Sequence, residues 1–130
     1  MARHPLERAK MYRLRIEAGF DAAHKIEGYE GKCARLHGHT YKVEVFVVAK
    51  ELGPIGISFD LRLLKEKLHN ITERLDHSFL NDLKELGNPS VENISKYFFQ
   101  NMKDNLPNGV TLEKTRVWET PKSWCEYFEV

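Results

Sequence analysis

The sequence contains few cysteines, almost no net charge and no long hydrophobic run, and each absence excludes a class of protein. Its 130 residues include two cysteines, and 20 Lys and Arg residues balance 19 Asp and Glu residues to give a formal net charge of +1. This balance provides no basic surface for nucleic acid. No apolar run approaches the ~20 residues of a membrane span. We therefore expect a protein that binds neither nucleic acid nor a membrane.

The cysteines and the chain length predict one domain in a reducing compartment. Cys33 and Cys125 are far apart in the sequence, which favours free thiols in the cytoplasm over a disulfide framework. Residues 1–10 are polar and basic and lack the apolar stretch of a secretory signal, so they are interpreted as a flexible extension. Residues 11–130 are sufficient for a single domain with its own core.

The hydrophobic pattern predicts four strands and two helices. Alternating apolar and polar residues indicate half-buried strands, expected at residues 11–23, 40–49, 110–119 and 123–130. Asp60 and Ser90 are good N-caps, and each precedes apolar residues at helical spacing. The order strand, strand, helix, helix, strand, strand predicts an α+β domain, in which two helices cover one face of a four-stranded antiparallel sheet.

One predicted strand is apolar on both of its faces. Val43, Val45 and Val47 alternate along residues 40–49, but Phe46 and Val48 make the second face apolar as well. The helices can cover only one face, and a four-stranded sheet has two free edges. We therefore expect partner subunits to bury the other face and to close the sheet into a barrel.

Three histidines predict a metal centre. If residues 37–49 form a strand, His37 and His39 project from the same face, because strand side chains alternate with period two. His24 ends the preceding predicted strand and can meet this pair from its neighbouring position. Three neutral imidazoles on one zinc ion leave a fourth coordination position open, as in catalytic zinc sites.

The role of Cys33 has two interpretations at this stage. A thiol near a dication or a histidine has a lowered pKa and can act as a general base. Alternatively, Cys33 could be a fourth zinc ligand that closes a purely structural site without chemistry.

Three further groups are candidates for chemistry, and each has a simpler structural explanation. Asp76 and His77 follow a predicted helix, where they could orient or activate the thiol or merely cap the helix end. Glu119 ends an aromatic strand segment and could hold the paired N–H donors of a guanine-like or pterin ring or simply be solvated. Glu92 lies in the first turn of the second helix, where it favours the helix dipole.

Six motifs, in the same order along the chain, closely resemble the 6-pyruvoyltetrahydropterin synthase and 6-carboxytetrahydropterin synthase family. The resemblance runs from about Met11 to Val130 and rests on residues 20–24 (FDAAH), 32–39 (KCARLHGH), 59–61 (FDL), 75–77 (LDH), 88–93 (NPSVEN) and 119–120 (ET). Three residues separate Cys33 from His37, which resembles the carboxy-forming enzymes of the queuosine and archaeosine pathways. Ser90 and Val91 stand where relatives often have a Thr-rich pair.

The resemblance implies a fold, a cofactor and residue roles. It implies the T-fold, a trimeric barrel commonly doubled to a hexamer, and zinc on His24, His37 and His39. It also implies that Cys33 is the base. His77, paired with Asp76, would be the proton-relay partner of this base, and Glu119 would anchor the pterin ring. Ser90 and Glu92 would make further contacts to the substrate. Arg35 and Lys32, beside the site, are candidate contacts for triphosphate.

The function expected from these observations is a zinc-dependent 6-carboxytetrahydropterin synthase. Its substrate would be 7,8-dihydroneopterin triphosphate, and it would release acetaldehyde and triphosphate. One alternative within the family is the pyruvoyl-forming synthase, which eliminates triphosphate from the same substrate. An alternative from another class is a noncatalytic assembly module with a structural zinc ion.

Overall fold

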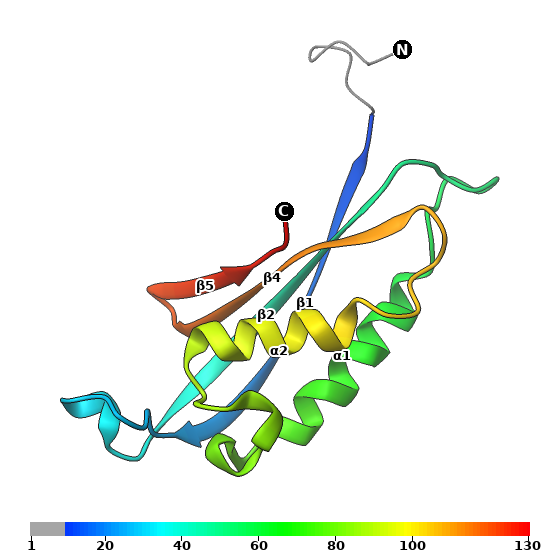
Figure 1. Ribbon diagram of the computed structural model, residues 1–130. Coiled ribbons are helices and arrows are strands. Elements are labelled where there is room, and N and C mark those ends of the chain that lie inside the picture. Colours follow the sequence, from blue (N-terminus) through cyan, green and yellow to red (C-terminus); the bar gives the residue numbers. More distant parts are fainter. Residues whose placement is uncertain (1–9) are drawn as a thin grey trace.

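The computed structural model describes residues 10–130 (Figure 1). The predicted extension, residues 1–10, lies outside the described residues except for Lys10. Within residues 10–130, no helix has the length and hydrophobicity needed to cross a membrane.

The sheet contains the four predicted strands and one short addition. The long strands are β1 (Tyr12–His24), β2 (His37–Ala49), β4 (Val110–Thr120) and β5 (Ser123–Tyr127). They pair antiparallel in the order β1-β2-β4-β5. The fifth strand, β3 (Ser78–Phe79), pairs in parallel with Ala22 and Ala23 of β1. Two residues are too few to produce a periodic signal, so the sequence did not predict β3.

Both helices begin at the predicted N-caps and lie on one face of the sheet (Figure 1). In α1 (Leu61–Leu75), the Asp60 carboxylate accepts the backbone N–H of Arg62 at 2.9 Å. In α2 (Val91–Met102), the Ser90 hydroxyl accepts the backbone N–H of Asn93 at 3.1 Å. These caps satisfy N–H groups that the first helical turn leaves without partners.

The core lies between the helices and the facing side of the sheet. Helix α1 packs on β1, and α2 packs on β4 and β5. The strand side chains that point toward the helices are almost fully buried, among them Ile16, Phe20, Tyr41, Val43, Val45, Val47 and Val117. Alternation along β1 and β2 therefore determines which side chains enter the core, as the sequence predicted.

On the opposite face, long charged side chains cover the second apolar row within the same chain. Phe46 is 8% exposed, because Lys114 and Arg116 lie over its ring at 4.9 and 5.1 Å from the centroid. Glu44, also buried, accepts hydrogen bonds from Arg15 and from the Trp118 indole. Partner subunits are therefore not required to bury Phe46, and the predicted assembly depends instead on the edges of the sheet.

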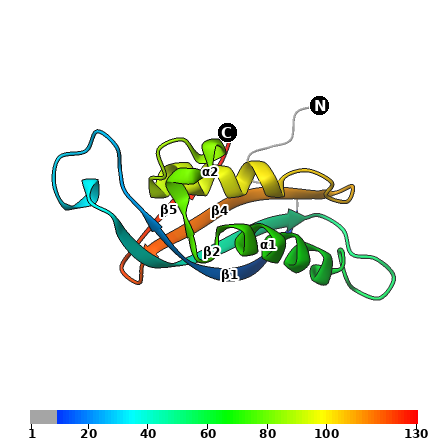
Figure 2. The ribbon, with the colours of Figure 1, turned by 90° about the horizontal axis from the view of Figure 1, so that it is seen from below.

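The β1–β2 loop projects from one end of the sheet (Figure 2). It includes a 3-10 turn at Lys32–Ala34 and is fixed at its base by a hydrogen bond from the Ile26 N–H to the Cys33 carbonyl at 2.8 Å. This is the end of the sheet at which His24 and His37 terminate their strands.

Candidate metal centre and active site

Strand register brings the three histidines together. His24 of β1 is directly opposite His37 of β2, and Ala22 is opposite His39. His39 is therefore the next residue along β2 on the face that carries His37, one diagonal step from His24. All three ligand nitrogens lie within 4.8 Å of one another. The predicted cluster is thus formed by the pairing of two strands, and a slip of one residue in the register would separate it.

Backbone carbonyls fix the orientation of two of the rings. His24 Nδ1 is 2.7 Å from the Pro89 carbonyl oxygen, and His37 Nδ1 is 2.7 Å from the Arg35 carbonyl oxygen. A carbonyl oxygen can only accept, so each Nδ1 carries the proton and each Nε2 presents a lone pair. Metal-binding histidines are held by this kind of outer hydrogen bond.

The two lone pairs point at one another, which requires a positive charge between them. His24 Nε2 and His37 Nε2 are 3.0 Å apart, and two acceptors at this distance repel unless a proton or a cation lies between them. Zinc–nitrogen bonds of ~2.0–2.1 Å at tetrahedral angles place two ligand nitrogens about 3.3 Å apart. The observed separation is close to that value, so the residues present fit a zinc ion.

His39 contributes the third nitrogen. Its Nε2 atom is buried and has no hydrogen-bond partner within the described residues, which is a costly state for a polar atom unless a ligand occupies it. Burial lowers the pKa of His39, while the negative charge of Glu119 opposes this shift. A lowered pKa favours the neutral imidazole, which is the form that binds metal.

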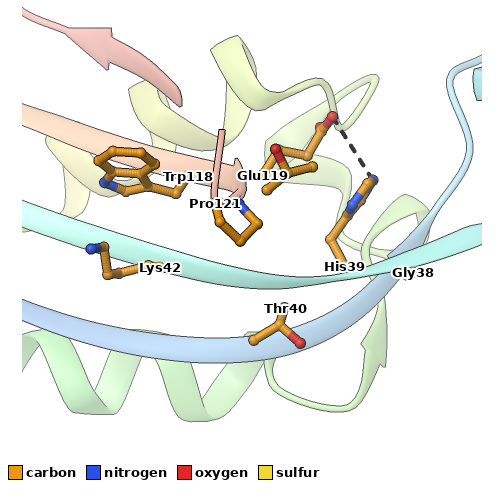
Figure 3. A pocket seen from close by; sticks show the side chains of 8 residues that line it. Gly38, His39, Thr40, Lys42, Trp118, Glu119 and Pro121 are labelled. Atoms are coloured by element: carbon orange, nitrogen blue, oxygen red, sulfur yellow. Dashed lines mark ion pairs between the residues drawn. The ribbon is translucent and has the colours of Figure 1, made fainter. Parts of the chain in front are cut away.

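Glu119 lies beside this cluster at the end of β4. Its Oε1 atom is 3.8 Å from His39 Nε2. Figure 3 shows the two side chains pointing toward one another at one end of a cavity, with Lys42 and Trp118 at the other end. The cavity has a volume of about 520 Å³ and opens where β4 stops pairing with β2, beyond Lys42 and Trp118. It therefore offers a bound molecule both the imidazole of His39, a candidate metal ligand, and the carboxylate of Glu119.

Cys33 is exposed on the 3-10 turn of the β1–β2 loop. The group of mutually close ligand atoms contains the three histidines and not the Cys33 thiol. This arrangement favours an open metal site over one closed by Cys33. Lys32 and Arg35, the candidate triphosphate contacts, are also exposed in this loop.

Asp76 and His77 form a second constellation, at the end of α1. His77 Nδ1 is 3.0 Å from Asp76 Oδ2. Hydrogen bonds from the Asp21 backbone N–H and from His77 lower the pKa of the Asp76 carboxyl. His77 has φ = 56°, a left-handed conformation that is uncommon for non-glycine residues. Its side chain shares a cavity of about 480 Å³ with His39 of the same chain.

Ser90 and Glu92 have clear structural roles. The Ser90 hydroxyl caps α2, and Glu92 is exposed in its first turn. The preceding residue, Pro89, contributes the carbonyl that orients His24. The start of α2 is therefore coupled to the metal centre through the backbone.

Sequence reasoning missed several groups around the site. The Pro89 and Arg35 carbonyls are backbone atoms, so no side-chain pattern identifies them. Tyr41 falls within the strand predicted at residues 40–49 and was assigned no role at the site, yet its hydroxyl lies 3.3 Å from His24 Nδ1. Tyr41 follows His37 and His39 at intervals of two residues, so the strand alternation could have predicted that it shares their face.

The fold and the site together define a small α+β domain that carries three converging imidazoles at the open end of its sheet. Residues 13–130 match the model of the 6-pyruvoyl tetrahydropterin synthase family. The chain belongs to this family.

Individual relatives agree with this assignment. The chain is 32% identical to the 6-carboxy-5,6,7,8-tetrahydropterin synthase of Haemophilus influenzae, over 92% of this chain and 100% of that protein. It is 39% identical to a dihydroneopterin monophosphate aldolase of Pyrococcus furiosus, over 82% and 89% of the two chains. Among solved structures, the 6-pyruvoyl tetrahydropterin synthase of Caenorhabditis elegans superposes with a TM-score of 0.81 at 27% identity, covering 96% of this chain and 100% of that one.

Proposed function

We propose that the protein is a zinc-dependent lyase, a 6-carboxytetrahydropterin synthase that acts on 7,8-dihydroneopterin triphosphate. The observation that carries the proposal is the convergence of three imidazoles beside a cavity walled by Glu119, where buried His39 Nε2 has no hydrogen-bond partner among residues 10–130. Several relatives named 6-carboxy-5,6,7,8-tetrahydropterin synthase, at 32–35% identity, support the choice of reaction.

Each candidate residue has a defined task in this reaction. When bound, zinc supplies Lewis-acid chemistry that lowers the cost of removing a proton from the substrate side chain. The Cys33 thiolate accepts that proton, and His77 with Asp76 exchanges protons with the thiol. The Glu119 carboxylate accepts N–H donors of the pterin ring and so positions the reacting carbon. Arg35 and Lys32 would contact the triphosphate, and Ser90 and Glu92 would contribute contacts at the start of α2.

The decisive experiment supplies the zinc-loaded full chain with dihydroneopterin triphosphate. We expect acetaldehyde, measured by a coupled alcohol dehydrogenase, in equal amount to a 6-carboxytetrahydropterin product identified by mass spectrometry. Loss of triphosphate with a 6-pyruvoyl product and no acetaldehyde would assign the pyruvoyl-forming reaction instead. His69→Ala, which changes an exposed histidine on α1, is the matched control for site variants.

The Pyrococcus furiosus relative supports a second candidate, aldol cleavage of dihydroneopterin monophosphate. Its identity, 39%, exceeds that of the relatives named as carboxy-forming synthases described above. The two candidates differ in the phosphate chain that the substrate carries. Parallel assays with the monophosphate and the triphosphate separate them, because kcat/KM should favour the triphosphate at least tenfold if the first proposal is correct.

The free edges of the sheet support a homo-oligomeric assembly. β3 pairs with β1 only at Ala22 and Ala23, so within residues 10–130 the earlier part of β1 has strand pairing on one side only. β5 is the edge on the other side. We expect these edges to pair between subunits in a trimeric barrel, doubled to a hexamer. The cytoplasmic location expected from the free thiols likewise stays a prediction.

The resemblance also predicts that Asp76 and His77 serve the site of a neighbouring subunit. Mixing inactive Cys33→Ala subunits with inactive His77→Ala subunits should then restore part of the activity. Mixtures that stay inactive despite demonstrated subunit exchange would place both groups in one chain, as the cavity shared by His77 and His39 allows.

A further inference from the structure

The β1–β2 loop, residues 25–36, is held in place by polar contacts and not by the core. Residues 25–36 neither belong to the hydrophobic core nor pack against it, and residues 27–33, which include Cys33, are exposed. A loop with few buried apolar contacts opens easily unless hydrogen bonds restrain it. Among residues 10–130, the side chains outside the loop that hydrogen-bond to it are those of Asn81, Asn88 and His37.

The two asparagine side chains each bind both backbone groups of one loop residue. Asn81 Oδ1 accepts the N–H of Lys25 at 3.0 Å, and Asn81 Nδ2 donates to the carbonyl of the same residue at 2.8 Å. Asn88 repeats this pattern on Glu27, with both distances at 2.9 Å. A side-chain amide carries an acceptor and a donor next to one another, so it can replace the backbone of a neighbouring strand. Side chains therefore continue the pairing of β1 beyond its last residue.

Ile26 lies between these two loop residues and bonds to the segment that carries the thiol. The Ile26 N–H donates to the Cys33 carbonyl at 2.8 Å. Residues 25–27 are thus bound by the asparagines at both ends and by the Cys33 backbone in the middle. Because His24 immediately precedes this segment, the same contacts determine where Cys33 lies relative to the metal centre.

The asparagines are themselves attached to well-packed parts of the domain. Asn81 follows Leu80, which is 0% exposed, in the 3-10 turn Leu80–Asp82 after β3. The backbone carbonyl of Asn88 accepts the side-chain amide of Asn93 on α2 at 2.7 Å. The two asparagines therefore connect an exposed loop to the core and to α2.

We infer that Asn81 and Asn88 are positioning residues that fix the β1–β2 loop and so set the position of the Cys33 thiol. The inference rests on the proposed function, in which the Cys33 thiolate accepts the substrate proton. The two amides act through the backbone of residues 25–27 and contact no reacting atom. A general base must lie within hydrogen-bond reach of the proton that it removes, and a displacement of about 1 Å can lower the rate roughly 100-fold.

The test compares Asn81→Ala and Asn88→Ala with Asn101→Ala in the zinc-loaded full chain. Asn101 is the matched control, because its half-buried amide also donates to a backbone carbonyl, that of Tyr97 at 2.8 Å, but does so within α2. Amide hydrogen exchange at Ile26 is followed by NMR without substrate, and kcat and KM are measured with dihydroneopterin triphosphate. Zinc content is determined on the same samples.

We expect exchange at Ile26 to become at least about tenfold faster in both loop variants, because each loses two hydrogen bonds to residues 25–27. The value of kcat should fall roughly five- to thirtyfold, with KM and zinc content unchanged. In a Cys33→Ala background the same substitutions should cause no further loss of kcat, which distinguishes positioning of the thiol from general stabilisation. Asn101→Ala should leave exchange at Ile26 and kcat at the parent values.

Parent-like exchange at Ile26 or parent-like kcat in both loop variants would overturn the inference. A loss of kcat that persists in full without Cys33 would overturn it as well, because the asparagines would then act on another group. Exchange needs no substrate. A parent enzyme that fails to turn over dihydroneopterin triphosphate would therefore reject the proposed function, while exchange at Ile26 would still show whether the asparagines hold the loop.

Two substitutions protect the test against side effects. If Asn88→Ala loses zinc through the neighbouring Pro89 carbonyl, Asn81→Ala decides the inference by the same criteria. If Asn81→Ala does not fold, Asn81→Asp takes its place, because the carboxylate keeps an acceptor for the Lys25 N–H and removes only the donor to the Lys25 carbonyl.

Discussion

The three histidines and the proposed proton-transfer groups differ in how firmly the chain holds them. His24 is 1% exposed, and strand pairing and two backbone carbonyls fix its ring and that of His37. In contrast, Cys33 lies on an exposed loop, and the His77 side chain is 80% exposed. The single chain therefore holds the three candidate metal ligands together in advance, while the proposed proton-transfer groups remain accessible.

This contrast has a physical reason. Metal ligands must converge within a few tenths of an ångström, and the register of adjacent strands brings their side chains together. Proton-transfer groups must reach a substrate that enters from outside, and residues at the ends of secondary structure elements provide that access. Substrate binding or a neighbouring subunit would complete the arrangement around Cys33 and His77.

The largest expected effect comes from disrupting the firmly held region. Replacing His37 by Ala removes one of two facing lone pairs, and we expect zinc to be lost and activity to become undetectable. Zinc content is measured by atomic emission after gel filtration, with His69→Ala as the control. Stoichiometric zinc in a His37→Ala, His39→Ala double variant would rule out the assigned ligands.

The sequence predicted the shared face of the histidines and the helix α1, but not the conformation of the loop or the backbone contacts around the site. Period-two spacing predicted that His37 and His39 share a face, and leucine spacing predicted α1 from its N-cap Asp60 onward. Neither pattern contains information about loop conformation, so the sequence left the fourth-ligand role of Cys33 open. The Asp21 contacts to Asp76 and His77 involve backbone atoms of β1, and backbone atoms give no side-chain signal in the sequence.

The next largest effect is expected in the exposed region. Cys33→Ala should keep one zinc per chain and bind substrate, yet lose roughly 10²–10⁴ in kcat, the range that general-base catalysis contributes. Cys125→Ala, which changes the other free thiol, should be close to the parent. Loss of zinc in Cys33→Ala would instead revive the closed structural site and remove the contrast between the two regions.

Glu119 lies between the two regions, because it contacts His39 and also walls the cavity. Glu119→Gln replaces a carboxylate by a group that carries its own donor, so one ring N–H would face another. The expected cost is about 1–3 kcal/mol, a loss of roughly 5- to 150-fold in kcat/KM, with zinc retained. An unchanged kcat/KM would show that the pterin ring is held elsewhere.

The smallest effect tests whether the start of α2 supports the metal centre. Ser90→Ala removes the N-cap hydroxyl that accepts the Asn93 N–H, and loss of such a cap costs ~1 kcal/mol. If the cap also holds Pro89 in place, its carbonyl should orient His24 less firmly, and zinc affinity should fall by a few-fold together with the free energy of unfolding.

Denaturant unfolding and competition with a zinc chelator measure these two quantities. Asp60→Ala is the matched control, since it removes the equivalent cap of α1. The start of α1, unlike that of α2, provides no carbonyl that orients one of the three histidines. A loss of stability in both variants with zinc affinity lowered only in Ser90→Ala is expected if α2 positions His24 through Pro89. Equal zinc affinity in both would mean that strand register alone is sufficient to hold the three imidazoles.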